Sequence, residues 1–446
     1  MTATAPAPAN KGAPARGVAV RRRAAAAVRA VLHEGQRLEA VLDYDGLDRS
    51  DRALLRELAT GSVRWAIRLR AVLDDLLDRP LPKRETEVEA LLLVGLYQLA
   101  HTTIPPYAAV SASVGALSKG KGWARRLVNG VLRRFGRERE ARLAAADERS
   151  PAVATGHPEW LVGELQGAYP DSWAAVLAAN NAPPPLTLRV AGDRAAYLRE
   201  LADAGIAGEA HPEVASAVVL GEFLPVAALP GFADGRVSVQ DAAAQLAAPL
   251  LDPQPGERVL DACSAPGGKL AHLLERQPDA RVTALEVDPQ RLAKVRETLE
   301  RTGAAPQALM AGDASRPRTW WDGTPFDRIL VDAPCSGTGV VRRHPDIKHL
   351  RRPQDLAPMA QRQAALLAAL WPLLRPGGRL LYATCSVLPA ENGDQVAAFL
   401  AGHADARAQA LPPIPGQAAG PGRQILPGEA GMDGFYYALL TKAPPS

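Results

Sequence analysis

Apolar residues recur at intervals of three and four between about residues 18 and 146, which is the period of an amphipathic α-helix. The segments 54–59 and 91–99 show this period, and the alternation typical of a β-strand is nearly absent from this part of the chain. We therefore expect a compact bundle of helices here. Its last helix, expected near residues 123–143, is strongly basic, because nine Lys and Arg but only two Glu occur from Lys119 to Arg142.

The pattern changes in the middle of the chain. Three consecutive prolines at 183–185 cannot lie inside a helix and precede a short apolar run, so we expect a strand at 186–190. A helical pattern at 194–204 and an apolar run at 217–220 follow. Together these elements indicate a small α+β domain.

From about Val237, short apolar runs alternate with helical patterns of about ten to twenty residues. Such alternation is typical of a parallel, doubly wound sheet. The final run at 434–440 is expected to enter this sheet as an antiparallel strand. The other expected strands lie at 258–262, 281–286, 308–310, 328–331 and 379–383.

These patterns divide the chain into four parts, with a polar break at about residues 147–156 after the helical part. We expect a disordered tail at 1–17, the helical domain at 18–146, the small α+β linker domain at 147–235 and the α/β domain at 236–446. The first 23 residues contain no acidic residue, which a transit peptide would share, but a floppy tail rich in Ala and Pro is the preferred interpretation.

The formal net charge is only +4, but it is unevenly distributed. Residues 1–150 hold 26 Lys and Arg against 17 Asp and Glu, whereas residues 151–446 hold 26 against 31. A basic appendage on a mildly acidic body favours a polyanionic partner, of which nucleic acid is the commonest. The alternative is a helical surface whose charges merely face solvent.

Several classes of protein are excluded or disfavoured by composition. No run of eighteen or more apolar residues occurs, so we expect no membrane span. Three cysteines cannot form a disulfide framework, and a reducing cytoplasm fits them best. Neither a Cys-x-x-Cys pair nor clustered histidines occur, so we expect no metal site.

A glycine-containing loop, Cys263–Lys269, follows the expected strand at 258–262. It lacks the G-x-G-x-x-G spacing of a dinucleotide-binding loop. It also fails as a phosphate-binding loop, because Cys263 stands at the position of the first glycine and Leu270 at that of the magnesium-binding Ser or Thr. A ligand that carries a nucleoside but no triphosphate suits this loop better.

Acidic residues close the next two expected strands. Glu286 lies about twenty residues after the loop, where a carboxylate can accept hydrogen bonds from both hydroxyls of a ribose. Asp288 is expected to cap the following helix instead. Asp313 could accept a hydrogen bond from an adenine amino group or could cap a loop. The loop and the two acids in series favour a nucleoside cofactor.

Each of the three cysteines follows an expected strand: Cys263, Cys335 and Cys385. A cysteine after an apolar run is by default a buried packing residue. Three such residues at one sheet edge nevertheless indicate an α/β enzyme with a thiolate nucleophile. Cys263 is expected to serve the loop backbone and not the chemistry.

Three motifs resemble one known family: APGGK at 265–269, DAPCSGTGVVRRHPDIK at 332–348 and YATCSVLPAEN at 382–392. They are similar to the bacterial ribosomal RNA cytosine-5 methyltransferases of the RsmB (Fmu/Sun) type. GLYQL at 95–99, IPP at 104–106 and NGVLR at 129–133 resemble that family's NusB-like RNA-binding domain. The resemblance implies an all-α NusB-like bundle, a small α+β linker domain and a Rossmann-like class I methyltransferase domain with a mostly parallel sheet.

The resemblance implies S-adenosylmethionine as the methyl donor and a cytosine of 16S rRNA as the target. Cys385 would add to carbon-6 of the cytosine and so activate carbon-5, while Cys335 would assist proton removal and product release. Asp332 would contact either the cytosine or the cofactor, and Lys269 either the cofactor or the RNA. The implied cofactor contacts are Cys263, Ser264, Ala265, Pro266, Gly267, Gly268, Lys269, Glu286, Asp313 and Asp332.

The expected partner is 16S rRNA, naked or in an early small-subunit particle, bound by a monomeric protein. Basic side chains would supply phosphate contacts that do not depend on sequence. These are Arg125, Arg126, Arg133, Arg134 and Arg137 in the helical domain, and Arg342 and Arg343 near the catalytic cleft.

Two other interpretations remain open from the sequence. A DNA cytosine-5 methyltransferase would use Cys335 as its nucleophile, since that residue follows a proline. A non-catalytic RNA-binding or assembly factor would keep only the cofactor pocket. A covalent adduct between the protein and RNA separates both from the leading interpretation.

Overall fold

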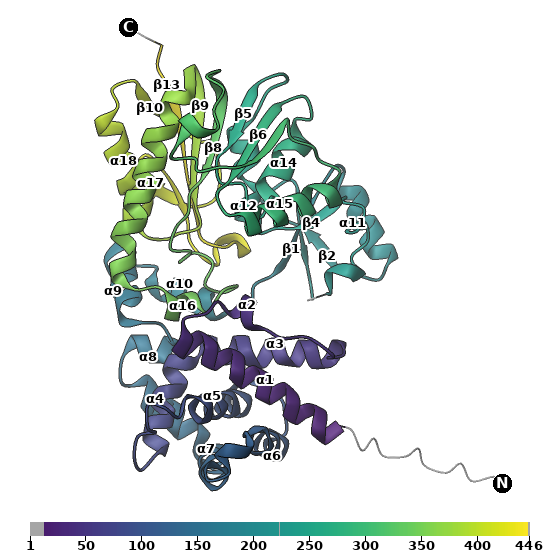
Figure 1. The fold of residues 1–446 in the computed structure, drawn as a ribbon, viewed down its shortest axis with the longest axis vertical. Coiled ribbons are helices and arrows are strands. Elements are labelled where there is room, and N and C mark those ends of the chain that lie inside the picture. Colours follow the sequence, from purple (N-terminus) through teal and green to yellow (C-terminus); the bar gives the residue numbers. More distant parts are fainter. Residues whose placement is uncertain (1–12, 223, 445–446) are drawn as a thin grey trace, which may run out of the picture. The chain divides into compact units, whose positions relative to one another are not determined.

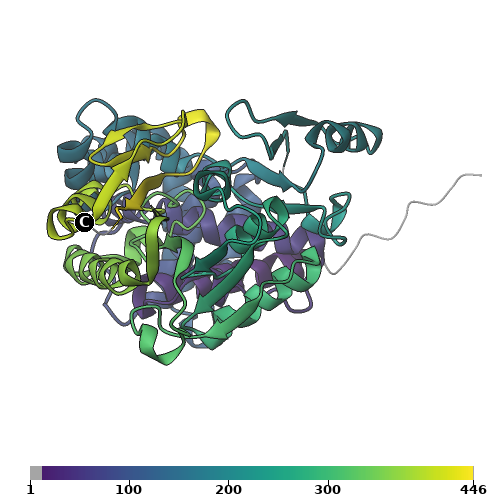
Figure 2. The ribbon, with the colours of Figure 1, turned by 90° about the horizontal axis from the view of Figure 1, so that it is seen from above.

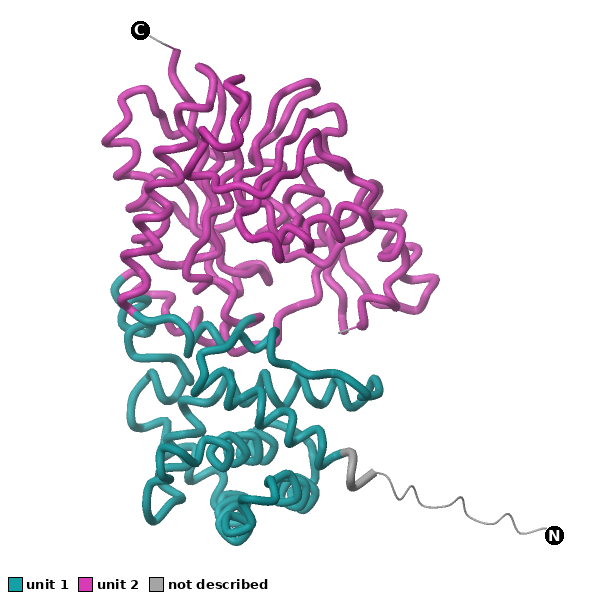
Figure 3. Tube along the Cα trace, viewed as in Figure 1, with its two compact units in different colours: residues 1–167, 344–352 teal, residues 168–343, 353–446 magenta. Residues whose placement is uncertain are grey.

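The protein is described by a computed structural model that covers residues 13–222 and 224–444. The chain forms two compact units, one of residues 1–167 with 344–352 and the other of residues 168–343 with 353–446 (Figure 3). Within the described residues, no helix combines the length and the apolar character needed to cross a membrane. Most of the tail expected at 1–17 lies outside the described residues, and the first helix already begins at Ala13, earlier than expected.

The first unit contains only helices among its described residues, so the expected all-α bundle is confirmed (Figure 1). Helix α5 is the centre of its core, because nearly every residue from Val88 to Leu99 is buried. The helices are α1 (Ala13–Glu34), α2 (Leu38–Val41), α3 (Arg49–Arg64), α4 (Ala66–Leu76), α5 (Thr86–His101), α6 (Pro106–Ala116), α7 (Ala124–Asp147) and α8 (Pro151–Thr155). Helix α8 lies inside the segment expected to be a polar break.

A segment from the motif at 332–348 also belongs to this unit. Helix α16 (Ile347–Leu350) packs into the bundle, where the Lys348 ammonium donates hydrogen bonds to the carbonyl oxygens of Arg64 and Gly156, both at 3.1 Å. The His349 ring nitrogen Nε2 lies 2.8 Å from the carbonyl oxygen of Val63. Burial lowers the pKa of Lys348 well below its ordinary value, because the ammonium is held away from water.

The second unit contains two sheets. The small sheet is antiparallel, with strand order β2-β3-β1-β4, and its core residues include Leu188, Leu201 and Val218. The expected strands at 186–190 and 217–220 are confirmed with the same limits. Helix α9 (Glu159–Ala168) belongs to the first unit except for its last residue. The elements here are α10 (Trp173–Asn181), β1 (Leu186–Val190), α11 (Arg194–Asp203), β2 (Gly208–Ala210), β3 (Ala217–Leu220) and β4 (Val237–Val239).

The large sheet has the order β11-β12-β13-β9-β8-β5-β6-β7, with β10 paired to β13. The five strands from β9 to β7 are parallel, and β13 joins β9 antiparallel, as expected from the sequence. The strands are β5 (Arg258–Asp261), β6 (Arg281–Glu286), β7 (Ala308–Ala311), β8 (Phe326–Asp332), β9 (Leu374–Thr384), β10 (Ala406–Gln409), β11 (Gln417–Ala419), β12 (Gly422–Ile425) and β13 (Phe435–Lys442).

Helices cover both faces of this sheet. Leu381 and Ala383 point to a core formed with α12 (Ala242–Gln245), α13 (Ala247–Leu251), α14 (Gly268–Arg276) and α15 (Pro289–Thr302). Their neighbours Leu380 and Tyr382 point to a second core, formed with α17 (Leu356–Leu370) and α18 (Gly393–Gly402). Figure 2 shows α17 and α18 together on one side of the strands. The expected Rossmann-like, mostly parallel sheet is therefore confirmed.

Strand β9 begins five residues before the position expected from the sequence. Its first part contains Pro376, Gly377 and Gly378. These residues interrupt the apolar pattern from which a strand is predicted, so this part of β9 was not expected. The pairing with β8 shifts register between Phe326 and Arg328 at this point. A side chain at Gly378 would lie 2.9 Å from the carbonyl oxygen of Asp327, so the close approach of the two strands requires glycine.

The order of the parallel strands reverses at β5, which has β6 on one side and β8 on the other. In open α/β sheets, ligands bind at the carboxyl ends of the strands where such a reversal occurs. The loops after β5 and β8 therefore form the expected ligand-binding edge.

Candidate active site

The loop after β5 is folded tightly against its neighbours. The amide of Gly267 donates to the carbonyl of Ser264 at 2.7 Å, and the amide of Ser264 donates to the carbonyl of Leu285 in β6 at 2.9 Å. Gly267 has a φ of 100°, and a side chain there would lie 3.1 Å from Cβ of Thr298 in α15. Only glycine fits this position without strain. Helix α14 then starts at Gly268, within the predicted loop.

Asp261, the last residue of β5, was not singled out in the sequence. Its side chain is 1% exposed, and neither carboxylate oxygen has a hydrogen-bond partner among the residues that the structure describes. Burial and the nearby charge of Asp332 raise the pKa of Asp261 to about 7. A buried carboxylate without a partner lowers the stability of the folded protein unless a bound ligand supplies the missing hydrogen bonds or charge. This site therefore fits a cofactor that carries a positive charge, such as the ammonium of an amino acid.

Lys269 and Asp332 form an ion pair at 2.7 Å that joins the loop after β5 to the end of β8. The Lys269 ammonium also lies 4.8 Å from the ring centroid of Phe435. Burial works against the charged ammonium, but the carboxylate of Asp332 outweighs it, and the pKa of Lys269 is raised. Lys269 therefore supplies a fixed positive charge at this edge of the sheet.

Glu286 lies at the end of β6 with a side chain that is 2% exposed. Its carboxylate accepts hydrogen bonds from the amide of Ala265 at 3.3 Å and from the amide of Asp288 at 3.0 Å. Asp288 caps α15 as expected, since its own carboxylate accepts from the amides of Gln290 and Arg291. Glu286 is thus held next to the cofactor loop by the backbone.

Asp313 follows β7 and its carboxylate organises a turn. One oxygen accepts from the amide of Ser315 at 2.9 Å and from its hydroxyl at 2.6 Å, and the other lies 3.4 Å from Arg316. Of the two roles expected for Asp313, the capping of a loop is what the structure shows. A contact with adenine remains a proposal.

The structure brings two of the three thiols together. Cys335 follows β8 and Cys385 follows β9, and their sulfur atoms lie 3.4 Å apart, at hydrogen-bonding distance and without a disulfide. Both residues are partly exposed. Cys263 packs against one core of the sheet, and burial raises the pKa of its thiol, so it is unsuited to nucleophilic chemistry.

The contact between the two thiols affects the protonation of Cys335. The hydrogen bond with Cys385, followed by burial, raises the pKa of Cys335 well above its ordinary value. Cys335 is therefore held in its protonated form, and either sulfur could be the donor in the contact between the two thiols. Cys385 is among the groups that raise the pKa of Lys269, so the ammonium lies close enough to act electrostatically on this sulfur.

A single buried carboxylate holds both cysteine loops. Glu391 is 0% exposed, and one of its oxygens accepts from the hydroxyls of Ser336 and Ser386, each at 2.5 Å. Its other oxygen accepts from the amide of Ser336 at 2.8 Å. These serines directly follow Cys335 and Cys385. Glu391 belongs to the motif YATCSVLPAEN, but its role as a clamp requires the tertiary structure.

The two cysteine loops also touch through their backbones. The amide of Gly339 donates to the carbonyl of Cys385 at 2.9 Å, and the amide of Gly434 donates to the carbonyl of Gly339 at 2.8 Å. A side chain at Gly339 would lie 2.3 Å from the carbonyl oxygen of Gly434. Glycine at this position is thus a condition for the approach of the two thiols.

Arg342 and Arg343 lie in a buried network of ion pairs, not on a free surface. The Arg342 side chain is 4% exposed, pairs with Asp433 and donates to the carbonyl of Gly431 at 2.7 Å. Arg343 pairs with Asp433 at 2.6 Å and with Asp241 at 2.9 Å. Buried carboxylates already neutralise these charges, so the ion pairs give no support to the expected RNA contacts of the two arginines, which stay a prediction.

The basic side chains of α7 differ from these. Arg134 is partly buried and lies 3.4 Å from Glu138 in an ion pair. The other four arginines expected to bind RNA are exposed, and none of their side chains has a hydrogen bond or ion pair with another described residue: Arg125, Arg126, Arg133 and Arg137.

Comparison with known proteins agrees with this architecture. A family model described as 16S rRNA methyltransferase RsmB/F matches residues 248–441. A model of the ferredoxin-like domain of the same family matches residues 157–227, and the NusB family matches residues 18–137. The crystal structure of a methyltransferase homolog protein from Pyrococcus horikoshii is 26% identical, with a TM-score of 0.58 over 66% of this chain and 99% of that chain.

Curated relatives match nearly the whole chain. Ribosomal RNA small subunit methyltransferase B from Pseudomonas putida is 49% identical over 95% of this chain and 98% of its own length. The protein of the same name from Vibrio vulnificus is 46% identical over 95% of this chain and 99% of its own length.

The doubly wound sheet, the glycine loop at its switch point and the adjacent orphan carboxylate define a methyltransferase that depends on S-adenosylmethionine. The cofactor fits the site, since Asp261 lacks the positively charged partner that the methionine end of the donor carries. The chain belongs to the family of 16S rRNA methyltransferases RsmB/F. The resemblance found in the sequence is thereby confirmed.

Proposed function

We propose that the protein transfers a methyl group from S-adenosylmethionine to carbon-5 of a cytosine in 16S rRNA through a covalent adduct between Cys385 and the base. The observation that carries this proposal is the pair of thiols 3.4 Å apart at the carboxyl ends of β8 and β9. Methylation of oxygen or nitrogen needs no second thiol. The names of the relatives support 16S rRNA as the substrate.

S-adenosylmethionine supplies an electrophilic methyl group when bound. Asp261 and Asp332 would hold the methionine end, with the loop from Cys263 to Lys269 lining the site. Glu286 would accept hydrogen bonds from the ribose hydroxyls, because its carboxylate lies against the loop amide of Ala265. Asp313 would contact the adenine with the carboxylate oxygen that does not hold the turn.

Cys385 would act as the nucleophile. Cytosine is a poor nucleophile at carbon-5, and addition of a thiolate at carbon-6 makes carbon-5 electron-rich. The Lys269 ammonium would stabilise the negative charge of a Cys385 thiolate, and the Cys335 thiol would donate a hydrogen bond to it. The raised pKa of Cys335, which keeps that residue protonated, supports Cys385 as the nucleophile.

Cys335 would then assist the release of the product. The hydrogen bond with Cys385 is the largest cause of the raised pKa of Cys335. Once the sulfur of Cys385 is bonded to carbon-6, that contribution disappears, and the Cys335 thiol gives up its proton to solvent more easily. The Cys335 thiolate can then accept the proton from carbon-5, the carbon-5 to carbon-6 double bond forms again and Cys385 leaves as a thiolate.

The basic helix α7 would supply RNA contacts. An enzyme that modifies a base must take it from a loop or flip it out of a helix, so it needs phosphate contacts that hold the surrounding RNA. Arg125, Arg126, Arg133 and Arg137 are exposed and free for this role. Arg134 contributes less, because Glu138 partly neutralises its charge.

The test uses the Cys335→Ala variant mixed with a 16S rRNA transcript and S-adenosylmethionine, followed by a denaturing gel. The expected result is a slowly migrating band, because the adduct forms but cannot be resolved. The band disappears in the double variant Cys335→Ala, Cys385→Ala. The cofactor affinity of each variant serves as the control for folding.

A band that persists without Cys385 would assign the nucleophile to another residue and contradict the proposal. A band with DNA and none with RNA would support the alternative of a DNA methyltransferase. Methyl transfer to the transcript with no adduct in any cysteine variant would show that the chemistry is not covalent.

A further inference from the structure

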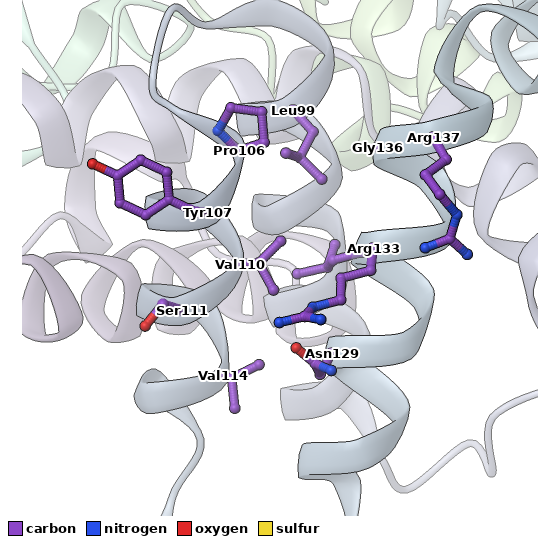
Figure 4. A pocket seen from close by; sticks show the side chains of 11 residues that line it. Leu99, Pro106, Tyr107, Val110, Ser111, Val114, Asn129, Arg133, Gly136 and Arg137 are labelled. Atoms are coloured by element: carbon purple, nitrogen blue, oxygen red, sulfur yellow. The ribbon is translucent and has the colours of Figure 1, made fainter.

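A groove lies between α6 and α7 on the surface of the helical bundle (Figure 4). Its volume is about 560 Å³, within the range of about 300–1,000 Å³ that is typical of small-molecule sites. Apolar side chains of Leu99, Val110, Val114 and Leu132 line the groove. The remaining lining residues include Tyr107 and Ser111 from α6 and Asn129, Arg133 and Arg137 from α7.

The polar residues from α7 form one line. Asn129, Arg133 and Arg137 follow one another at intervals of four and so lie on the same side of the helix. In Figure 4 the Arg133 side chain reaches from α7 toward α6, above Asn129. Two like charges at this spacing destabilise a helix slightly, and no acid of the described chain compensates them.

Three other arginines of the same helix are paired with its acids. Arg134 and Arg142 both bind Glu138, and Arg139 lies 3.8 Å from Glu140. Two of the four unpaired arginines of α7, Arg133 and Arg137, line the groove, and the acids of the helix pair with arginines outside it. Two uncompensated positive charges at the groove indicate an anionic occupant.

An aromatic ring stands at the edge of the groove. Tyr107 is 79% exposed, the highest value among the exposed large apolar side chains of the described chain. Its hydroxyl has no hydrogen-bond partner among the described residues, so the ring is not held there by a polar contact. An exposed ring with one free face offers a platform on which a nucleobase can stack.

We propose that this groove binds one unpaired nucleotide of the RNA substrate, with its base stacked on Tyr107 and its phosphates bound by Arg133 and Arg137. The amide of Asn129 would contact the edge of the base or the ribose. A flat aromatic group and two anions one nucleotide apart are together the chemistry of single-stranded RNA. The groove is thus a second RNA site, separate from the pair of thiols. This inference rests on the proposed function, which makes RNA the substrate.

The experiment measures the affinity of the full-length protein for a 16S rRNA transcript as a function of salt. Tyr107→Ala is expected to weaken binding about 5- to 100-fold, because one stacked base is lost. Tyr107→Phe should bind within about twofold of the wild type, since the ring remains. The double variant Arg133→Gln, Arg137→Gln should make the plot of log affinity against log salt shallower by about 1 to 2.

Matched controls come from the same surface of the bundle. Trp123 is 54% exposed and Arg126 is exposed and unpaired, but neither lines the groove. Trp123→Ala should leave the affinity within about twofold of the wild type, and Arg126→Gln should change the salt dependence by no more than one phosphate contact. Circular dichroism and cofactor affinity report whether each variant is folded.

Three outcomes would overturn the inference: wild-type affinity in Tyr107→Ala, equal losses in Tyr107→Phe and Tyr107→Ala, or an equal loss in Trp123→Ala. Adduct formation by Cys335→Ala on the same transcript is measured in parallel. An adduct together with unchanged binding in Tyr107→Ala would reject the groove and leave the proposed function intact. Loss of binding in Tyr107→Ala without any adduct would support the groove and reject the covalent mechanism.

Discussion

Two arginines of helix α7 in the helical unit and two arginines of the sheet-containing unit have opposite environments. Arg133 and Arg137 on α7 are exposed and unpaired, whereas Arg189 and Arg342 in the second unit are buried and fully engaged. The Arg189 side chain is 1% exposed and binds Glu275 at 2.6 Å. The same residue type is thus left unpaired at these positions of α7 and stabilises the architecture of the protein at positions 189 and 342.

The physical reason lies in desolvation. A buried guanidinium is tolerated only when its hydrogen-bond donors have partners. Arg189 donates to Glu275, to Gln240 and to the carbonyl oxygen of Gly268 at the start of α14. Such an arginine orders the backbone around it and is unavailable to RNA. A count of basic residues therefore does not reveal where a polyanion binds; their ion pairs do.

The strongest test of this comparison separates chemistry from binding. Cys385→Ala is expected to lower the rate of methyl transfer to a 16S rRNA transcript at least about 10³-fold, because the covalent route is lost. Arg133→Gln should change mainly the KM for RNA. Radiolabelled methyl transfer under saturating cofactor measures both, and an activity of Cys385→Ala above a tenth of the wild type would contradict the assignment.

Stability should separate the two kinds of arginine. Arg342→Ala leaves the buried carboxylate of Asp433 with only Arg343, so we expect a loss of about 3 kcal/mol in the free energy of unfolding. Arg133→Ala should change it by less than about 0.5 kcal/mol, since the side chain is exposed and unpaired. Urea denaturation of the two variants makes the comparison, and equal stabilities would refute it.

Glu391 should matter for the alignment of the thiols and not for cofactor binding. Glu391→Ala releases Ser336 and Ser386, and we expect a loss of about 10- to 100-fold in kcat with little change in the affinity for S-adenosylmethionine. Glu391→Gln should retain more activity because it still accepts from the amide of Ser336. Equal losses of kcat and of cofactor affinity would indicate general unfolding instead.

Replacement of Asp261 by Asn should stabilise the cofactor-free protein but weaken its binding of S-adenosylmethionine. Its pKa of about 7 lies above the ordinary value of 3.8, so its contribution to the stability of the cofactor-free protein is present below about pH 4 and is lost as pH rises through about 7. Asp261→Asn should therefore be more stable than the wild type at pH 8, by about 1 kcal/mol or about 2–4 °C in Tm.

The advantage of Asp261→Asn should shrink toward pH 5, where the wild-type carboxyl is already protonated. The same variant should bind S-adenosylmethionine at least about tenfold more weakly, because the carboxylate that would pair with the ammonium of the cofactor is lost. Thermal unfolding between pH 5 and 8 and isothermal titration measure these effects. A variant that is less stable than the wild type at pH 8 would show that Asp261 is satisfied without a ligand.

The local pattern was sufficient for most elements. The alternation of apolar residues located the strand Arg281–Glu286 with its observed limits, and the period of three to four located the helical bundle. The pattern of apolar residues failed to predict a strand where pairing with a neighbouring strand outweighs the low strand propensity of the local residues. The start of β9 contains Pro376 and two glycines, and only its pairing with β8 makes it a strand.

The residue types at strand ends were enough to select the cysteines and the cofactor loop, because few chemical roles combine a thiol after a strand with a glycine-rich turn. Their relative distances were not accessible in this way. Asp261 was not predicted from the sequence, since an acidic residue at the end of a strand is common. Only its burial without a partner distinguishes it from other acidic residues at strand ends.

The sequence by itself determined the class of fold, the family and the thiol, carboxylate and glycine residues available for chemistry, because these depend on local periodicity and on residue type. The tertiary structure alone decided which thiols meet, which carboxylate clamps them and which arginines remain free. Those properties arise from contacts between residues far apart in the chain, such as Arg342 with Asp433 and Cys335 with Cys385. Burial then sets the protonation and the availability of each group.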